Sequence, residues 1–327
     1  MYLLPMVDRH IAIPCVRSQR RKTKMRQQEN VFVRVKTSIC QVSVRLPVVN
    51  VREKDNETVN WDTSLLSLHF LPSKLCNTSL QVLQNLTNRN QNAHQVDHQS
   101  IAKARLELQD WFQKTIHSSE AAAKTTKFGP KNSQYPYFLR HIIPRISFGN
   151  NCKIPDEKDS PSKCPFAVQT PVSRFHTDSN HTGFINLWLP MALVQNDHLG
   201  FLYHKPSQQL LTASLLEKFV NQESETTGIG ATRPISKTRL IRDFLESSCC
   251  VLYASPMTTG DAWIFRSGGL HGILHGSIHL NNTDDEYDDG HSGESSGSSE
   301  NCSRRSVEFR CQPYDYSKNQ WIFGEPL

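Results

Sequence analysis

Two runs near the start of the chain place an aliphatic residue at every second position. The residues concerned are Val31, Val33, Val35, Val42, Val44 and Leu46. A period of two predicts two strands that each bury one face. Residues 50–100 follow, and they are polar and rich in Asn and Gln, with little periodicity beyond a short helix expected near Leu80–Leu86.

A helical repeat starts at residue 100. Apolar residues recur at three- and four-residue spacing, and they are Ile101, Ala104, Leu108, Trp111, Phe112 and Ile116. This spacing predicts an amphipathic helix that packs on the core, with Ser100 as its N-cap. Residues 118–165 are loop-like, interrupted by the aromatic stretch Tyr135–Leu139. Two further helices are expected at about Leu210–Val220 and Lys237–Leu245.

Short strand-like segments dominate the C-terminal half. They are Phe184–Leu189, Leu199–Tyr203, Cys250–Tyr253, Ala262–Phe265 and Ser306–Cys311. Several short strands separated by turn signals favour a β-sandwich or barrel with flanking helices. Alternating βαβ units and a glycine-rich phosphate loop are both missing from the sequence, which disfavours a nucleotide-binding α/β fold. The expected fold class is therefore mainly β.

The composition agrees with a folded protein. Of 327 residues, 37% are hydrophobic, which supplies a sizeable core. No apolar run approaches the roughly 18–20 residues of a membrane helix, and no secretory signal is expected. The nine cysteines contain no C-x-x-C pair, so we expect neither a disulfide framework nor a zinc ribbon, and a reducing, cytoplasmic location.

Charge is concentrated in two segments. Six of the Lys and Arg residues that contribute to the net charge of +6 lie within Arg17–Arg26. We expect a solvated basic arm there, and no nucleic-acid partner, because no binding module follows it. Seven acidic residues among Gly and Ser in 281–301 predict a disordered insertion. The expected division is a basic N-terminal region at 1–95 and one β domain at 96–327.

The residues that suggest chemistry begin with His176 and Asp178, in the sequence RFHTD. On an extended segment, positions i and i+2 project from the same face, so both side chains can converge on one metal ion. One further histidine would complete a 2-His-1-carboxylate set, which leaves positions open for other ligands. Downstream, TTGDAWIFRSGGLHGILHGSI offers His271 and His275.

A later segment, RRSVEFRC, supplies cationic groups. Four polar side chains are expected on one face of this strand: Arg304, Ser306, Glu308 and Arg310. A guanidinium can hold a carboxylate in bidentate fashion, which an ammonium cannot match.

The order of H-x-D, then Gly-Asp-strand-His, then a strand with Arg resembles the iron(II)- and 2-oxoglutarate-dependent dioxygenases. It is most similar to the phytanoyl-CoA hydroxylase group and to methoxylase/desaturase-like proteins related to cephalosporin 7-alpha-methoxylation. Both groups carry a strand like Asn186-Leu187-Trp188 after H-x-D, and an element like His198-Leu199-Gly200-Phe201-Leu202. The resemblance covers roughly residues 170–312.

This resemblance implies a double-stranded β-helix, or jelly-roll, with Fe(II) at His176, Asp178 and a distal histidine. His275 fits the His-Gly-Ser pattern ahead of the closing strand, and His271 fits the ungapped distance from Gly260, so both stay candidates. Arg304 aligns with the arginine that binds 2-oxoglutarate. Arg310 is either a second contact of the cosubstrate or a residue at the barrel mouth paired with an acid.

The resemblance also implies an oxygenase that uses molecular oxygen to hydroxylate a small organic molecule, with desaturation left open. Two alternatives remain. The first is a non-catalytic jelly-roll binding module in which the His/Asp pair is structural. The second is a zinc-dependent hydrolase, which is disfavoured because the sequence has no H-E-x-x-H motif. The sequence leaves the oligomeric state open.

Overall fold

The structure is a computed structural model that describes residues 30–36, 41–53, 61–62, 65–87, 97–118, 136–148, 168–169, 174–178, 184–194, 196–227, 236–269, 271–280 and 302–322. The basic run Arg17–Arg26 and the acidic segment 281–301 lie outside these residues. Within the described part, no helix is both long and apolar enough to cross a membrane.

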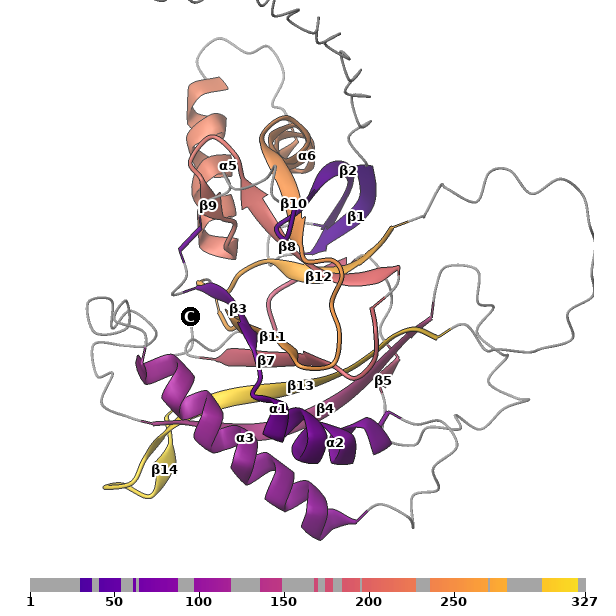
Figure 1. The fold of residues 1–327 in the computed structure, drawn as a ribbon. Helices are drawn as coiled ribbons and strands as arrows, with labels where there is room; N and C mark the ends of the chain where they lie inside the picture. Colours follow the sequence, from indigo (N-terminus) through magenta and orange to yellow (C-terminus); the bar gives the residue numbers. More distant parts are fainter. Residues whose placement is uncertain are drawn as a thin grey trace, which may run out of the picture.

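The strands form two sheets that lie one above the other (Figure 1). The first sheet has the order β3-β11-β7-β13-β4-β5, and β14 pairs with β13. Its strands are β3 (Leu66–Phe70), β11 (Asp261–Arg266), β7 (Ile185–Pro190), β13 (Cys302–Asp315), β4 (Tyr137–Phe148), β5 (Val168–Gln169) and β14 (Gln320–Trp321). Long antiparallel pairing of β13 with both β4 and β7 forms its centre.

The second sheet has the order β12-β8-β10-β2-β1-β6, and β9 pairs with β8. Its strands are β12 (His275–His279), β8 (Asp197–His204), β10 (Cys249–Tyr253), β2 (Gln41–Asn50), β1 (Asn30–Lys36), β6 (Arg174–Phe175) and β9 (Gln209–Leu210). A bridge between His176 and His275 joins β6 back to β12. The six strands of the main order, from β12 to β6, thus close into a ring, and β9 lies outside it.

The chain alternates between the two sheets in the manner of a jelly-roll. It runs from β4 in the first sheet to β6 in the second, back to β7, across to β8 and β10, back to β11, across to β12 and back to β13. With the His176–His275 bridge placing β6 beside β12, two facing four-strand sets result, with the orders β4-β13-β7-β11 and β6-β12-β8-β10. This topology is a double-stranded β-helix, so the expected mainly β jelly-roll is confirmed.

Apolar side chains fill three layers. Trp188, Phe201, Trp263 and Phe265 pack between the two sheets. The outer face of the first sheet carries α1 (Ser73–Leu75), η2 (Cys76–Leu80), α2 (Gln81–Asn85) and α3 (His98–Ser118) (Figure 1). Aliphatic residues of β1 and β2 form the third cluster together with residues of α5 (Ala213–Thr227) and α6 (Lys237–Ser248).

Strand β4 differs from the sequence-based expectation of a loop across 118–165. Tyr137, Leu139 and Ile146 are buried, but His141 is exposed. The register with β13 shifts between Arg310 and Cys311, opposite this part of β4. A shift of this kind breaks the period of two that identifies a strand in a sequence.

Two smaller differences concern the N-terminal third. Helix α3 begins at His98, and the Asp97 carboxylate accepts from the backbone N–H groups of Gln99 and Ser100. Asp97 therefore caps this helix, where Ser100 was expected. In addition, β1, β2 and β3 pair with strands beyond residue 95, so residues on both sides of that position share both sheets.

Candidate metal centre

His176 and His275 lie side by side where β6 meets β12. The backbone N–H of His176 donates to the His275 carbonyl at 3.0 Å, and the reverse hydrogen bond is 3.2 Å. Their ring centroids are 5.2 Å apart. Gly276 permits this approach, because a Cβ there would lie 2.4 Å from the carbonyl oxygen of Arg174.

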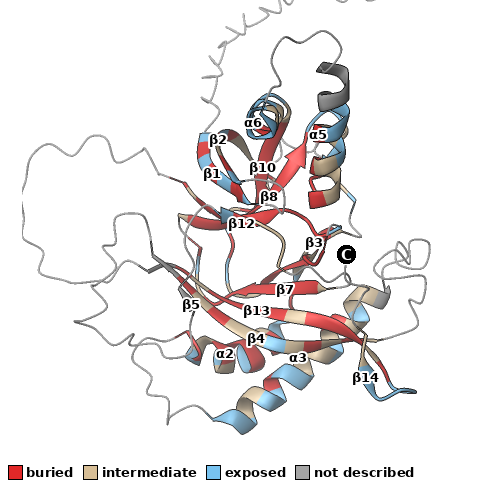
Figure 2. Cartoon of the chain, turned by 180° about the vertical axis from the view of Figure 1, so that it is seen from behind, coloured by how far each residue is buried: buried red, intermediate tan, exposed pale blue. Residues whose placement is uncertain are grey.

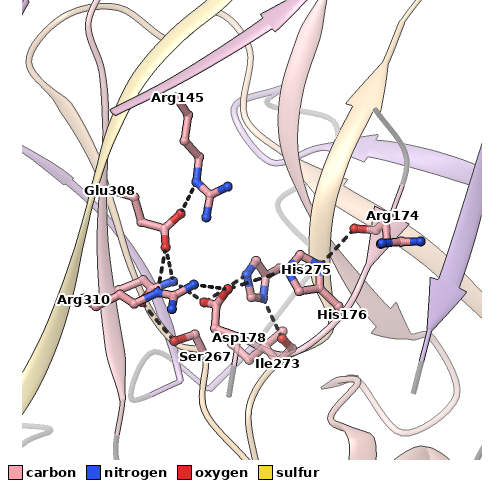
Figure 3. Close-up of polar contacts among 10 residues, drawn as sticks. Arg145, Arg174, His176, Asp178, Ser267, Ile273, His275, Glu308 and Arg310 are labelled. Atoms are coloured by element: carbon pink, nitrogen blue, oxygen red, sulfur yellow. Dashed lines mark hydrogen bonds and ion pairs between the residues drawn. The ribbon is translucent and has the colours of Figure 1, made fainter. Parts of the chain in front are cut away.

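Asp178 completes a group of three potential ligands (Figure 3). Its backbone N–H donates to the Ser267 carbonyl at 2.9 Å, which fixes the turn after β6. Its Oδ1 lies 3.6 Å from Nε2 of His176, and its Oδ2 lies 3.4 Å from Nε2 of His275. One ligand atom from each of the three residues lies within 4.8 Å of the others, so the group could hold a metal ion.

Both imidazoles are oriented by backbone carbonyls two residues earlier. Nδ1 of His176 lies 3.1 Å from the carbonyl oxygen of Arg174, and Nδ1 of His275 lies 2.9 Å from that of Ile273. A hydrogen bond of this kind places a proton on Nδ1, so Nε2 is the ring atom that can bind a cation once it has lost its own proton. Both Nε2 atoms face Asp178.

The electrostatics keep Asp178 ionised. Burial by itself would raise the pKa of its carboxyl, but the charge of His275, hydrogen bonds from both histidines and the charge of Arg310 hold the pKa well below its usual range. Burial would lower the pKa of His275, yet Asp178 raises it overall. The group therefore presents a buried anion that a divalent cation would neutralise.

Asn186 holds Asp178 from the neighbouring strand β7. The Asn186 side chain is fully buried. Its Nδ2 donates to Oδ2 of Asp178 at 2.5 Å and to Oε1 of Glu308 at 3.2 Å, while its Oδ1 accepts from Ser267 Oγ at 3.0 Å. The signal in the sequence is an amide within the otherwise apolar strand INLWLP, because a buried amide needs partners.

Arg310 lies on the other side of Asp178. Its Nη2 is 3.4 Å from Oδ1 of Asp178, and its Nε is 3.5 Å from Oε1 of Glu308. The second oxygen of Glu308 accepts from Nε of Arg145 at 2.7 Å. Both oxygens of the Asp178 carboxylate are thus held by a donor outside the metal group, Asn186 on one and Arg310 on the other.

Arg304 lies deeper between the sheets and is 3% exposed. Its Nη2 donates to Oγ of Ser277 at 2.7 Å, and its guanidinium lies over the ring of Trp188 at 5.8 Å. Ser277 is two residues beyond His275 on β12, so Arg304 and the metal group face the same interior. Ser306, on the same face of β13, is fully buried, and its Oγ has no hydrogen-bond partner among the described residues.

The two candidates for the distal histidine are separated by the fold. His275 is buried and belongs to the metal group. His271 is exposed in the turn before β12 and lies outside that group.

No protein-family model matches the sequence, and no curated protein matches it. Among solved structures, the chain is similar to an iron and alpha-ketoglutarate-dependent endoperoxidase, NvfI, with 11% identity, a TM-score of 0.37 and coverage of 91% of this chain and 95% of that chain. A single-substitution variant of that enzyme gives 9% identity, a TM-score of 0.41 and coverage of 84% of both chains. With TM-scores below 0.5, these similarities carry no argument about the function of this chain.

Proposed function

We propose that the chain is an Fe(II)- and 2-oxoglutarate-dependent oxygenase. The observation that carries the proposal is the convergence of His176, Asp178 and His275 at the junction of β6 and β12 in a jelly-roll. Two imidazoles and one carboxylate on one side of a metal are the ligand set of non-haem Fe(II) oxygenases, and they leave coordination positions open. His275 is proposed as the third ligand in preference to His271.

The residues beside the metal group fit 2-oxoglutarate. Its distal carboxylate needs a fixed cation and hydroxyl donors in a buried place, and Arg304, Ser277 and Ser306 supply them. The buried hydroxyl of Ser306 would gain a hydrogen-bond acceptor when a carboxylate binds, which offsets the cost of its burial. We therefore assign Arg304 as the anchor of the cosubstrate.

Two neighbouring side chains fix the orientation of the Asp178 carboxylate. Asn186 and Arg310 hold the two oxygens of Asp178, so the carboxylate keeps one orientation toward the histidines. Arg310 is 30% exposed and lies next to a metal ligand, which suits a second contact to the cosubstrate or the substrate. Iron with 2-oxoglutarate and molecular oxygen would supply the oxidising power to hydroxylate an unactivated C–H bond, with succinate and carbon dioxide as coproducts.

We further propose that the substrate is a small organic molecule. The order of the sequence motifs supports a phytanoyl-CoA hydroxylase-like or cephalosporin methoxylase/desaturase-like subfamily. Residues 96–327 carry the oxygenase site, and the protein works in the cytoplasm.

An anaerobic titration tests the proposal. Fe(II) is added to the full chain, followed by 2-oxoglutarate, and the visible absorption spectrum is recorded. We expect a charge-transfer band that appears only when both are present. A chain that binds neither would support the binding-module alternative, and a chain that binds Zn(II) but forms no Fe(II)–2-oxoglutarate complex would support a hydrolase.

A further inference from the structure

Four cationic side chains share the outward face of β1, β2 and β6. They are Arg34, Lys36, Arg45 and Arg174, and all four are exposed. The residues that alternate with them are buried, so the cations project to the opposite, exposed face of these strands. Among the described residues of β1, β2 and β6, none on this face is acidic, and its other members include Asn30, Phe32, Gln41, Ser43 and Pro47. Figure 2 shows the exposed residues along β1 and β2. We call the four cations the basic face.

The strand pairing concentrates this charge. Arg34 on β1 is in register with Arg174 on β6, so their Cα atoms are about 5 Å apart. Arg45 lies diagonally across from Arg34, because Phe32 pairs with Arg45. Among the described residues, none of these cations forms an ion pair. Like charges in register are destabilising, and an anion between them would remove the repulsion.

The basic face begins at the metal group. Arg174 is two residues before His176, on the same side of an extended segment, and its carbonyl accepts from the His176 ring. The side chain of His176 is 39% exposed, whereas those of Asp178 and His275 are buried. The accessible edge of the metal group is therefore the edge beside Arg174, which Figure 3 shows on the side of His176 away from Asp178.

We propose that the basic face binds a phosphate group of a small-molecule substrate whose oxidised carbon lies at the metal centre, an inference that rests on the proposed function. A phosphate monoester carries close to two negative charges and three acceptor oxygens at neutral pH, and guanidinium forks match those oxygens in bidentate fashion. Phe32, 54% exposed on the same face, offers an apolar neighbour to the organic part. Four cations across three short strands fit one small anion better than the longer backbone track of a nucleic acid.

The first test measures anion binding without any metal. Inorganic pyrophosphate is titrated calorimetrically into the full chain. We expect binding by the wild type, and affinity about tenfold weaker in Arg34→Gln and in Arg174→Gln. Arg242→Gln, which removes the same charge from an exposed position on α6, should bind like the wild type. Equal affinity in all variants would overturn the proposal, as would binding of a single-stranded oligonucleotide by a chain that does not bind pyrophosphate.

The second test measures proximity to the metal. The chain is loaded with Mn(II), whose binding is checked by electron paramagnetic resonance, and phenyl phosphate is observed by phosphorus NMR. We expect line broadening in the wild type that is lost in Arg174→Gln. If Mn(II) binds to the protein but the phosphate signal is not broadened, the proposed phosphate site near the metal is wrong, and the proposed function is unaffected. A chain that binds no Mn(II) would instead contradict the proposed function.

Discussion

His176 and His275 exchange both of their backbone hydrogen bonds, at 3.0 and 3.2 Å. In an antiparallel pair, two residues that exchange both bonds stand directly opposite each other, with their side chains on the same face. This pairing aims both imidazoles at one point. The hydrogen bonds from the two Nδ1 atoms to backbone carbonyls then leave both Nε2 atoms for a shared ion.

The same pairing separates the two candidates for the distal histidine. We expect His275→Ala to lose Fe(II) binding, because only two ligands would remain. His271→Ala should bind Fe(II) like the wild type, since His271 is exposed and outside the metal group. Equilibrium dialysis of both variants against Fe(II) under argon measures this. The reverse pattern would transfer the third ligand to His271.

The approach of β6 to β12 depends on the absence of a side chain at position 276. A Cβ there would lie 2.4 Å from the carbonyl oxygen of Arg174. We expect Gly276→Val to destabilise the fold by about 1–3 kcal/mol through overpacking, and Gly276→Ala by less. Both should weaken metal binding, because His176 directly follows β6 in the chain. Thermal unfolding and Fe(II) affinity are the measurements, and a Gly276→Val protein with wild-type metal affinity would contradict this role.

Asn186 bridges Asp178 and Glu308 and accepts from Ser267. Asn186→Ala should lower metal affinity about 10–100-fold, the usual effect of removing a group that orients a metal ligand. It should also cost about 1–3 kcal/mol of stability, because buried groups lose a partner. Ser267→Ala removes one bond of this network and serves as the milder control. Wild-type metal affinity in folded Asn186→Ala would rule out this positioning role.

Arg304 and Ser306 give a prediction that separates binding from stability. Arg304→Lys should keep Fe(II) yet bind 2-oxoglutarate about tenfold or more weakly, because a point charge cannot replace the bidentate fork. Arg305→Lys, on the opposite face of β13, is the matched control.

Ser306→Ala should not lower the Tm, because the removed hydroxyl has no partner among the described residues. This substitution should nevertheless lower the affinity for 2-oxoglutarate. Unchanged affinity would argue against binding of the cosubstrate carboxylate beside Ser306.

Much of the fold could be predicted from local patterns. The alternation in β1 and β2 and the helical spacing of α3 follow directly from burial of one face. Strand β4 could not be recognised, because its register with β13 shifts within it. Residues on both sides of position 95 join the same sheets through long-range pairing, which no local pattern records.

Two of the three residues of the metal group could be predicted from the sequence. The spacing of His176 and Asp178 brings them onto one face of an extended segment, and the structure brings both to one point. The sequence could not distinguish His271 from His275, because two residues four positions apart project from the same face of an extended segment. The contact between β6 and β12 distinguishes them. The role of Asn186 could not be predicted, because its hydrogen-bond partners lie on other elements, two of them far along the chain.

The claim that His176, Asp178 and His275 bind one metal ion is central to this account. The most direct measurement is the stoichiometry and affinity of Fe(II) binding under anaerobic conditions, for the wild type, His176→Ala and Asp178→Ala, with the Tm of each. We predict one Fe(II) per wild-type chain and no measurable binding in either variant, with both variants still folded. A folded His176→Ala or Asp178→Ala protein that binds Fe(II) with wild-type affinity would contradict the account.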